Sequence, residues 1–427
     1  MAEKEATIAG AVTPRKAAVL RVLGNPSFRS LWIGQLCGNL AVTTTMFVLA
    51  LRIYQITGSS TAVSALYLTF GVPAFLFAMA AGAIVDHFDK RTILLLAHTS
   101  RAALAALFLF AFQSVPLVYA LAFLYAFITQ FSTPSEAPTI PRLVGKSDLV
   151  TANSIFSLTF YSALAIGSIL AGPTLRFFGP SGVFVFLCSI FLLAAVAVWQ
   201  IPKEVGKKTV VSILATTSFF YLLARVFRSI EEGLDYIKTR NKLLDALVLL
   251  MGTQVTLAIL ATLGPAFAVR LLEVDVHDAS LFLVGPTVLG ILVGALWVGN
   301  KGYKLGTKKL IQRGVIGAGV LLIIIATTAR FNHVPFFFII VIGLFFALGF
   351  ANSLLDVPAN TTLQHESEGD MRGRVYGILT AVVGGIGMLP VLVGGVLADV
   401  VGVGKVIFLL GLFIAGYGFW RVRYNTN

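Results

Sequence analysis

The chain reads Gly-Ala-Ile-Val-Asp-His-Phe-Asp-Lys-Arg at residues 82–91, a short charged stretch between two long apolar segments. The flanking segments, residues 61–85 and 92–112, are long enough to cross a hydrocarbon core of about 30 Å, which takes about 20 apolar residues. Two basic residues, Lys90 and Arg91, close the stretch. Because basic residues stay on the cytoplasmic side of membrane proteins, the stretch predicts a tight cytoplasmic turn between two transmembrane helices.

The same pattern extends over the whole chain of 427 residues, of which 57% are hydrophobic and only 12% are charged. A soluble domain has about 25% charged residues, so this composition points to lipid as the solvent. Backbone groups cannot stay unpaired in lipid, and we therefore expect helices. The sequence predicts an all-α integral membrane protein with twelve spans, at residues 31–54, 61–85, 92–112, 116–140, 150–175, 182–201, 244–269, 279–299, 309–329, 335–358, 374–399 and 404–420.

The positive charge is distributed unevenly among the connections between these spans. The formal net charge is +13, and most of the 32 lysines and arginines lie in the two tails and in every second connection. The opposite connections hold only Arg176, Arg270, Arg330 and Lys405. This asymmetry predicts a multi-pass protein of the cell (plasma or inner) membrane with both termini in the cytoplasm. It also argues against a nucleic-acid-binding patch, which would gather the charge on one surface.

Several functional classes find no support in the sequence. Cys37 and Cys188 both fall within spans, and the five histidines are scattered without metal-ligand spacing, so we expect no disulfide, no metal site and no cofactor. The phosphate loop of an ATP-driven pump is missing. No nucleophile–base arrangement indicates an enzyme.

A long polar stretch divides the chain into two halves of six spans. We expect a first half at residues 1–201, a cytoplasmic connection at 202–243 and a second half at 244–427. An amphipathic segment from Phe219 to Ile237 predicts a helix on the membrane surface. The halves repeat each other at an offset of about half the chain, which favours the two-part architecture of transporters. The repeated pairs are Glu136-x-Pro138 with Asp356-x-Pro358, Pro73 with Pro286, and Pro173 with Pro390. Gly290 and Gly294 have the spacing of a helix-packing face.

The stretch 82–91 resembles the cytoplasmic signature of the major facilitator superfamily, in which a glycine is followed four residues later by an aspartate and then by a basic pair. The resemblance implies that this cluster latches onto the start of the eleventh span and gates the transporter. The gating residues it points to are Gly82, Asp86, Lys90, Arg91, Arg142, Arg372 and Arg374. The alternative is a solvated turn without a gating role.

Three further stretches narrow the resemblance to the branch that contains macrolide-efflux proteins and the enterobactin exporter. They are Asn25–Trp32, Tyr54–Ser59 and Arg372–Gly377. The resemblance covers nearly the whole chain. It implies export of a small amphipathic molecule, drug- or siderophore-like, by proton antiport with alternating access. We expect a monomer whose partners are its substrate, the lipid and the proton.

The chain departs from the pattern of this branch at several positions. His87 stands where the signature usually has arginine, Asn39 where many members have an acidic residue, and His98 where many have an aspartate. The arginine that many proton antiporters carry in the fourth span is missing from residues 121–130. These departures keep open a second function, a membrane sensor or scaffold that retains the fold without transport.

Ionisable residues inside the spans are the candidates for coupling, because an intramembrane charge is costly. Glu136 and Asp356 either exchange protons or form structural salt bridges of the gate. Arg101 lies about 13 Å into the third span by helix rise and needs a partner, such as Glu136 or a backbone carbonyl. His98 shares its helix face and either titrates near neutral pH or satisfies a local hydrogen bond.

The superfamily resemblance implies that spans 1, 4, 7 and 10 line a central cavity. Such a cavity should be mostly apolar with a few polar anchors. The polar and aromatic candidates on these spans are Gln35, Asn39, Tyr125, Gln130, Gln254 and Asn352. Each of them serves equally well in helix packing.

Overall fold

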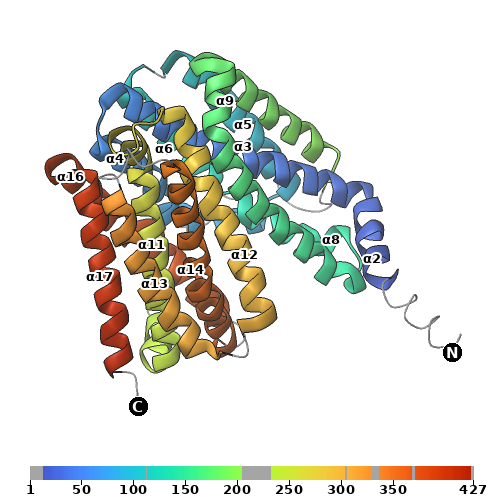
Figure 1. Cartoon of the computed structure of the whole chain (residues 1–427). Coiled ribbons are helices and arrows are strands. Elements are labelled where there is room, and N and C mark those ends of the chain that lie inside the picture. The colour runs from blue at the N-terminus through green and yellow to red at the C-terminus, as the bar shows by residue number, and fades with distance from the viewer. Residues whose placement is uncertain are drawn as a thin grey trace, which may run out of the picture. The chain divides into compact units, whose positions relative to one another are not determined.

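The computed structural model describes residues 13–111, 113–203, 232–302, 305–328, 336–367 and 371–424. These residues form helices joined by short connections, and they contain no strand. Eleven of the helical segments are long and apolar enough to cross a membrane. The described helices confirm the all-α membrane fold that the composition predicted (Figure 1).

The chain packs as two compact units. The first comprises residues 1–45, 76–167 and 178–222, and the second comprises residues 46–75, 168–177 and 223–427. Three helices therefore contribute to both units. The division of the sequence into halves at 1–201 and 244–427 remains a prediction. The shared helices are α3 (Pro26–Thr57), α4 (Ser60–His87) and α9 (Leu149–Trp199).

The rest of the first unit consists of shorter helices. They are α2 (Thr13–Gly24), α5 (Lys90–Ala111), α6 (Val115–Thr129), α7 (Ser132–Glu136), α8 (Ile140–Leu143) and η1 (Lys146–Asp148). A core cluster that includes Phe28, Leu94 and Phe156 joins α3, α5 and α9. An exposed ion pair of Arg21 with Asp148 connects α2 to the start of α9.

Helix α9 holds two of the predicted spans in one element. It has 51 residues, about 77 Å at 1.5 Å per residue, which is more than twice the hydrocarbon thickness. Gly179 has φ 68° and ψ 175° and breaks the helix between the predicted spans 150–175 and 182–201. This conformation is open to glycine at little cost, so Gly179 replaces a connecting loop. Counting α9 as two spans reconciles eleven segments with twelve predicted ones.

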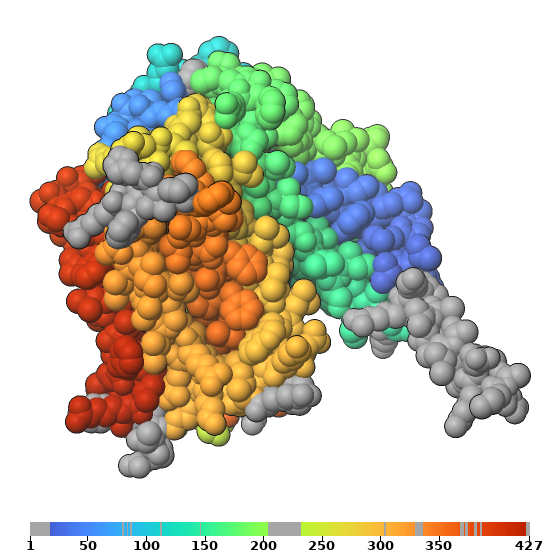
Figure 2. All heavy atoms as spheres, in the orientation of Figure 1, coloured from blue at the N-terminus to red at the C-terminus, as the bar shows by residue number. Residues whose placement is uncertain are grey.

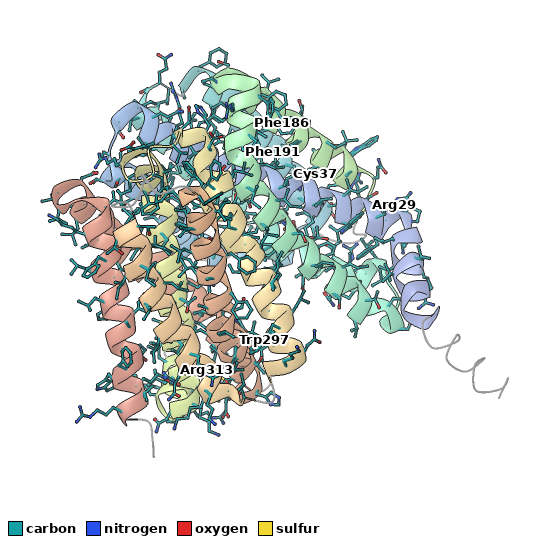
Figure 3. All side chains as sticks on the ribbon, in the orientation of Figure 1. Arg29, Cys37, Phe186, Phe191, Trp297 and Arg313 are labelled. Atoms are coloured by element: carbon teal, nitrogen blue, oxygen red, sulfur yellow. The ribbon has the colours of Figure 1, made fainter. Side chains whose placement is uncertain are left out.

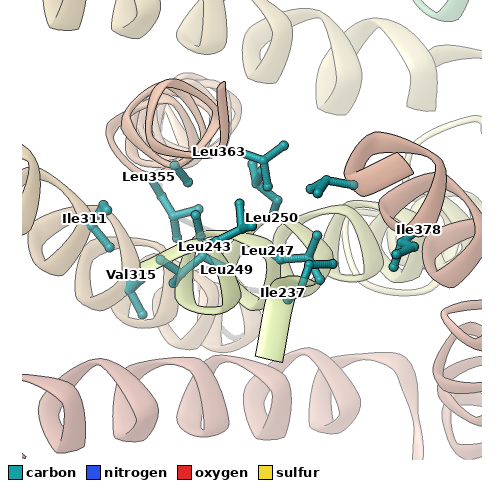
Figure 4. Close-up of a cluster of buried hydrophobic side chains, with 13 residues drawn as sticks. Ile237, Leu243, Leu247, Leu249, Leu250, Ile311, Val315, Leu355, Leu363 and Ile378 are labelled. Carbon is teal, nitrogen blue, oxygen red and sulfur yellow. The ribbon is translucent and has the colours of Figure 1, made fainter. Parts of the chain in front are cut away.

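The second unit is built on α11 (Asn241–Arg270) and on helices packed around it. These are η3 (Val276–Asp278), η4 (Ser280–Val284), α12 (Gly285–Lys301), α13 (Thr307–Thr328), α14 (Phe337–Glu366), α15 (Met371–Ala381), η7 (Val382–Ile386), α16 (Met388–Val401) and α17 (Val403–Tyr424). Figure 4 shows a core cluster in which Leu243, Leu247 and Leu250 of α11 meet Leu363 of α14 and Ile378 of α15. Both η4 and η7 are single π-helical turns within spans.

Small residues allow α12 and α14 to approach closely, as the spacing of Gly290 and Gly294 predicted. A Cβ at Gly290 would lie 1.9 Å from the carbonyl oxygen of Phe346, and one at Gly294 would lie 2.8 Å from Cβ of Ser353. Gly349 faces the carbonyl of Thr287 in the same way. The three glycines therefore let the backbones touch where lipid supplies no hydrophobic drive.

Large apolar side chains cover the outward surface of the second unit. Figure 2 shows α17, in red, along an outer edge of this unit. Leu409, Leu412, Phe413 and Phe419 of α17 are all exposed, as are Leu289, Leu292 and Leu296 of α12. An exposed apolar surface of this extent fits contact with lipid rather than with water.

Part of the expected membrane-surface helix lies outside the described residues. The prediction covered 219–237, and the structure describes only its last part, where residues 232–238 are helical. Ile237 is buried in the core cluster of the second unit.

We predict that Gly290→Leu destabilises the protein. The added side chain would overlap the backbone of α14, and overpacking of this kind costs about 1–3 kcal/mol. Thermal unfolding in detergent, followed by tryptophan fluorescence, should show a clearly lower midpoint. Gly299→Leu on the same helix is the matched control, because no described atom lies within 4 Å of its Cβ position. Equal midpoints for the two variants would contradict the packing argument.

Candidate functional site

A cavity of about 270 Å³ lies within the first unit. Helices α3, α5, α6, α7, α8 and α9 contribute its walls. Most of the lining side chains are polar, which is unusual for the interior of a membrane bundle. The lining residues are Gln35, Gly38, Asn39, His98, Arg101, Thr129, Ser132, Thr133, Glu136, Ala137, Ile140, Asn153, Phe156, Ser157, Phe160 and Tyr161. Four predicted site residues, Gln35, Asn39, Arg101 and Glu136, thus share one cavity.

Arg101 is the buried cation of this cavity. It lies on α5, three residues after His98, so both side chains leave the helix on one face. Its side chain is only 2% exposed, and its Nη2 donates to the hydroxyl of Ser132 on α7. Its guanidinium lies 5.8 Å from the ring centre of Phe191, which Figure 3 labels on α9. The serine and the aromatic ring are partners that the sequence did not indicate.

Glu136 enters the cavity from an interrupted part of the fourth span. That span ends as a regular helix at Thr129, continues as the short α7 and then passes through a turn before α8. Pro134 and Pro138 lie on either side of Glu136, and proline removes a backbone donor and disfavours a continuous helix. Glu136 and Arg101 attract each other electrostatically, but no ion pair joins them in the described part of the chain.

Several buried polar atoms around the cavity lack hydrogen-bond partners among the described residues. They are Oε1 of Gln35, Nδ2 of Asn39, both ring nitrogens of His98, and Nε of Arg101. The expectation that His98 satisfies a local hydrogen bond is therefore wrong. Its ring instead packs on α3, where a Cβ at Gly38 would lie 2.6 Å from Cε1 of His98.

Helix α9 supplies a wall that sequence reasoning missed. The superfamily resemblance directed attention to spans 1, 4, 7 and 10, yet the fifth span contributes Asn153, Ser157 and Tyr161. These residues recur every four positions, so they form one polar stripe along α9. Phe156 and Phe160 add aromatic surface beside the stripe. The spacing of the polar residues was a signal that could have identified this wall.

Other candidates lie outside the cavity. Tyr125 is fully buried and packs edge-on against Phe191 at 5.9 Å between ring centres. Gln130 donates its side-chain amide to the carbonyl of Ala126 at 3.0 Å, so it acts locally at the end of α6.

Three more candidates belong to the second unit. Asp356 accepts a hydrogen bond from Nδ2 of Asn360 at 3.2 Å, and Oδ1 of Asn360 accepts one from the hydroxyl of Tyr376 at 3.2 Å. Gln254 is exposed, and Oδ1 of Asn352 is buried without a hydrogen-bond partner among the described residues.

The gating residues are only partly described. The side chains of Asp86, Arg372 and Arg374 lie outside the described residues. Lys90 is buried, Arg142 is exposed, and Arg91 donates to the carbonyl of Trp199. Among the described residues, no atom of another segment lies within 4 Å of a Cβ built on Gly82.

Asp89 caps the following helix, α5. Its Oδ2 accepts hydrogen bonds from the backbone N–H of Thr92 at 3.0 Å and from the Thr92 hydroxyl at 2.5 Å. An aspartate before the first turn satisfies donors that the helix cannot, and its charge suits the positive end of the helix dipole.

Sequence reasoning also missed a carboxylate that caps a helix from another part of the chain. Asp399 on α16 accepts hydrogen bonds from the hydroxyl of Ser59 and from the backbone N–H groups of Ser60 and Thr61, at 2.6, 2.9 and 2.9 Å. The hydroxyl of Thr61 donates to it as well, at 2.8 Å. The guanidinium of Arg270 lies 3.9 Å from the same carboxylate. This cluster, which we call the Asp399 cap, ties α16 to the start of α4 within the second unit.

Comparisons with known proteins agree with this architecture. Residues 31–391 match the family model described as Major Facilitator Superfamily. An uncharacterized MFS-type transporter, YfiS of Bacillus subtilis (strain 168), is 24% identical over 382 residues, which cover 87% of this chain and 86% of that protein. The enterobactin exporter EntS of Salmonella choleraesuis (strain SC-B67) is 24% identical over 420 residues, or 92% of this chain and 93% of the exporter.

Solved structures show the same fold at low sequence identity. The nucleoside transporter NupG has a TM-score of 0.71 at 13% identity, covering 94% of this chain and 99% of that one. The POT family transporter PepTSo has a TM-score of 0.70 at 15% identity, covering 94% and 98%. At these identities the likeness concerns the fold alone.

We predict that Asp399→Ala destabilises the fold by about 2 kcal/mol or more, because it leaves donors at the start of α4 without their charged acceptor. Chemical unfolding in detergent micelles measures the change. Asp278→Ala is the matched control, since it removes a carboxylate whose ion pair with the exposed Arg176 is worth at most about 1 kcal/mol. If Asp399→Ala unfolds at the same denaturant concentration as Asp278→Ala, the Asp399 cap is not a stabilising contact.

Proposed function

Because the chain belongs to the Major Facilitator Superfamily, a family of membrane transporters, we propose that it exports small amphipathic molecules, drug- or siderophore-like, by proton antiport. The observation that carries this proposal is the cavity of the first unit. It combines a carboxylate, a guanidinium and an imidazole with an aromatic wall, inside segments that are otherwise apolar. The likeness to the enterobactin exporter supports the outward direction.

The proposed mechanism is alternating access by two halves, residues 1–201 and 244–427, joined by the connection at 202–243. Proline and glycine residues in the fifth and eleventh spans favour bending, and η7 places an irregular turn in the eleventh. The gating set proposed for the cytoplasmic side is Gly82, Asp86, Lys90, Arg91, Arg142, Arg372 and Arg374. We propose that the Asp399 cap holds α16 against the start of α4 on the side of the membrane opposite the cytoplasmic gate, where basic residues are sparse.

Orientation follows from charge. The tails and the basic connections would face the cytoplasm, so that both termini are cytoplasmic and the protein lies in the plasma or inner membrane. We propose a monomer that binds its substrate, lipid and a proton, and that takes part in no nucleic-acid binding. Asp356 remains a coupling candidate of the second unit, with Gln254 and Asn352 as candidates for substrate contact.

We predict that Glu136→Gln and Asp356→Asn each lower proton-driven transport by about tenfold or more, because an amide cannot carry the coupling proton. Purified variants in proteoliposomes with an imposed pH gradient would be tested against a panel of fluorescent amphipathic dyes, with and without an uncoupler. Membrane insertion should be unchanged. Asp278→Asn controls for loss of a half-buried carboxylate that lies outside the cavity.

Normal transport by both variants would exclude a coupling role for these carboxylates. Absence of uncoupler-sensitive transport by the unmodified protein across the whole panel would instead favour a sensor or scaffold that retains the fold.

A further inference from the structure

The cavity holds two opposite charges that do not neutralise each other directly. Arg101 is buried and hydrogen-bonded to a neutral serine, while Glu136 is the one carboxylate among the lining residues. A buried charge without an ionic partner is expensive. A direct ion pair would lower that cost, yet the described residues form none here. The arrangement leaves a positive and a negative group available to one occupant.

The polar atoms without hydrogen-bond partners also divide into donors, which suit an anionic group, and an acceptor, which suits a cationic group. Nε of Arg101 and Nδ2 of Asn39 are donors without acceptors, and Oε1 of Gln35 is an acceptor without a donor. Gln35 and Arg101 are more than nine-tenths buried. A buried polar atom without a hydrogen-bond partner is unfavourable, so a ligand that supplied the missing partners would bind more tightly. Two donors suit an anionic oxygen, and a carboxylate with an amide oxygen suits an ammonium group.

The remaining wall is apolar. Ile140, Phe156 and Phe160 line it, and Tyr161 presents an aromatic ring beside them. The volume of about 270 Å³ is just below the range of about 300–1,000 Å³ typical of sites for drug-sized ligands. The cavity therefore suits one aromatic ring system, of one or two fused rings, with a short charged tail, or one end of a larger molecule.

We propose that this cavity binds an amphipathic zwitterion, with its ammonium group at Glu136, its anionic oxygen at Arg101 and Asn39, and its apolar body against α9. This inference rests on the proposed transport function and names the substrate class. A proton on Glu136 would remove the site for the ammonium group. Proton and substrate would then compete for one carboxylate, which is the relation that antiport requires.

The competition gives binding a pH dependence with a definite sign. Protonation of Glu136 at lower pH weakens binding, and deprotonation strengthens it. The ionisable groups that face Glu136 are Arg101 and His98 from α5 and Tyr161 from α9, while α3 contributes only amides. His98 is buried beside Arg101, which disfavours a positive charge on its ring, so the pH dependence follows Glu136.

Three probes with one naphthalene ring test the charge requirement. They are 3-(2-naphthyl)alanine, a zwitterion; 2-(2-naphthyl)ethylamine, its cationic counterpart; and 3-(2-naphthyl)propionate, its anionic counterpart. Their charges do not change between pH 6 and 8. Calorimetric titration of the full-length purified protein at pH 8 should show that the zwitterion binds at least about tenfold more tightly than either of the others. Its affinity should fall at pH 6.

Two variants test which residue binds which charged group of the zwitterion. Arg101→Gln should remove the advantage of the zwitterion over the amine, and Glu136→Gln should remove its advantage over the propionate together with the pH dependence. Arg29→Gln, an exposed residue of α3 away from the cavity, should bind like the unmodified protein (Figure 3). If Arg101→Gln fails to elute as a folded protein in size-exclusion chromatography, Glu136→Gln alone decides, because its effect must be specific to the ammonium group.

Equal affinity for the three probes, tighter binding of the amine, or no binding of any probe would overturn the zwitterion site. Uptake of the same probes into proteoliposomes separates this outcome from failure of the proposed function. Charge-selective binding without flux would refute transport and leave the site standing. Uncoupler-sensitive flux of the amphipathic dyes without selectivity among the probes would leave transport standing and refute the site.

Discussion

A buried guanidinium organises the first unit. Lipid cannot solvate Arg101, so the neighbouring elements must satisfy its charge from within the protein. The hydroxyl oxygen of Ser132 on α7 accepts a hydrogen bond from it, and Phe191 from α9 presents a ring. Glu136 lines the same cavity without forming an ion pair with Arg101 among the described residues. The interrupted fourth span and the polar stripe of α9 both line the cavity that contains Arg101. Apolar packing alone would require neither of these features.

The sequence predicted the architecture well because membrane solvation leaves few choices. Apolar length identified the spans, and glycine spacing identified a packing face on α12, although not its partner α14. What it missed depends on local backbone geometry. The conformation at Gly179, the interruption around Glu136 and the π-helical turns change no average hydropathy, so no pattern of apolar residues could reveal them.

The candidate site was predicted in part. The sequence analysis selected polar residues within the spans, because polar groups are costly in lipid unless they serve a function. The structure places four of them around one cavity: Gln35, Asn39, Arg101 and Glu136. Two positions that depart from the pattern of the resembling branch, Asn39 and His98, lie in that cavity as well. The contribution of α9 and the partners of Arg101 depend on contacts between distant segments. One sequence without its structure does not show such contacts.

Gly179 makes the turn within α9 sensitive to substitution although the position is not crowded. The place that a side chain would occupy there is open, since no described atom lies within 4 Å of it. Backbone geometry nevertheless makes any other residue strained, at a cost of about 1–3 kcal/mol. In a scan of every substitution, this uncrowded position would therefore tolerate change as poorly as a residue of the core. Open space around a residue does not by itself make the residue tolerant of substitution. At position 179 the backbone conformation alone restricts which residue is accepted.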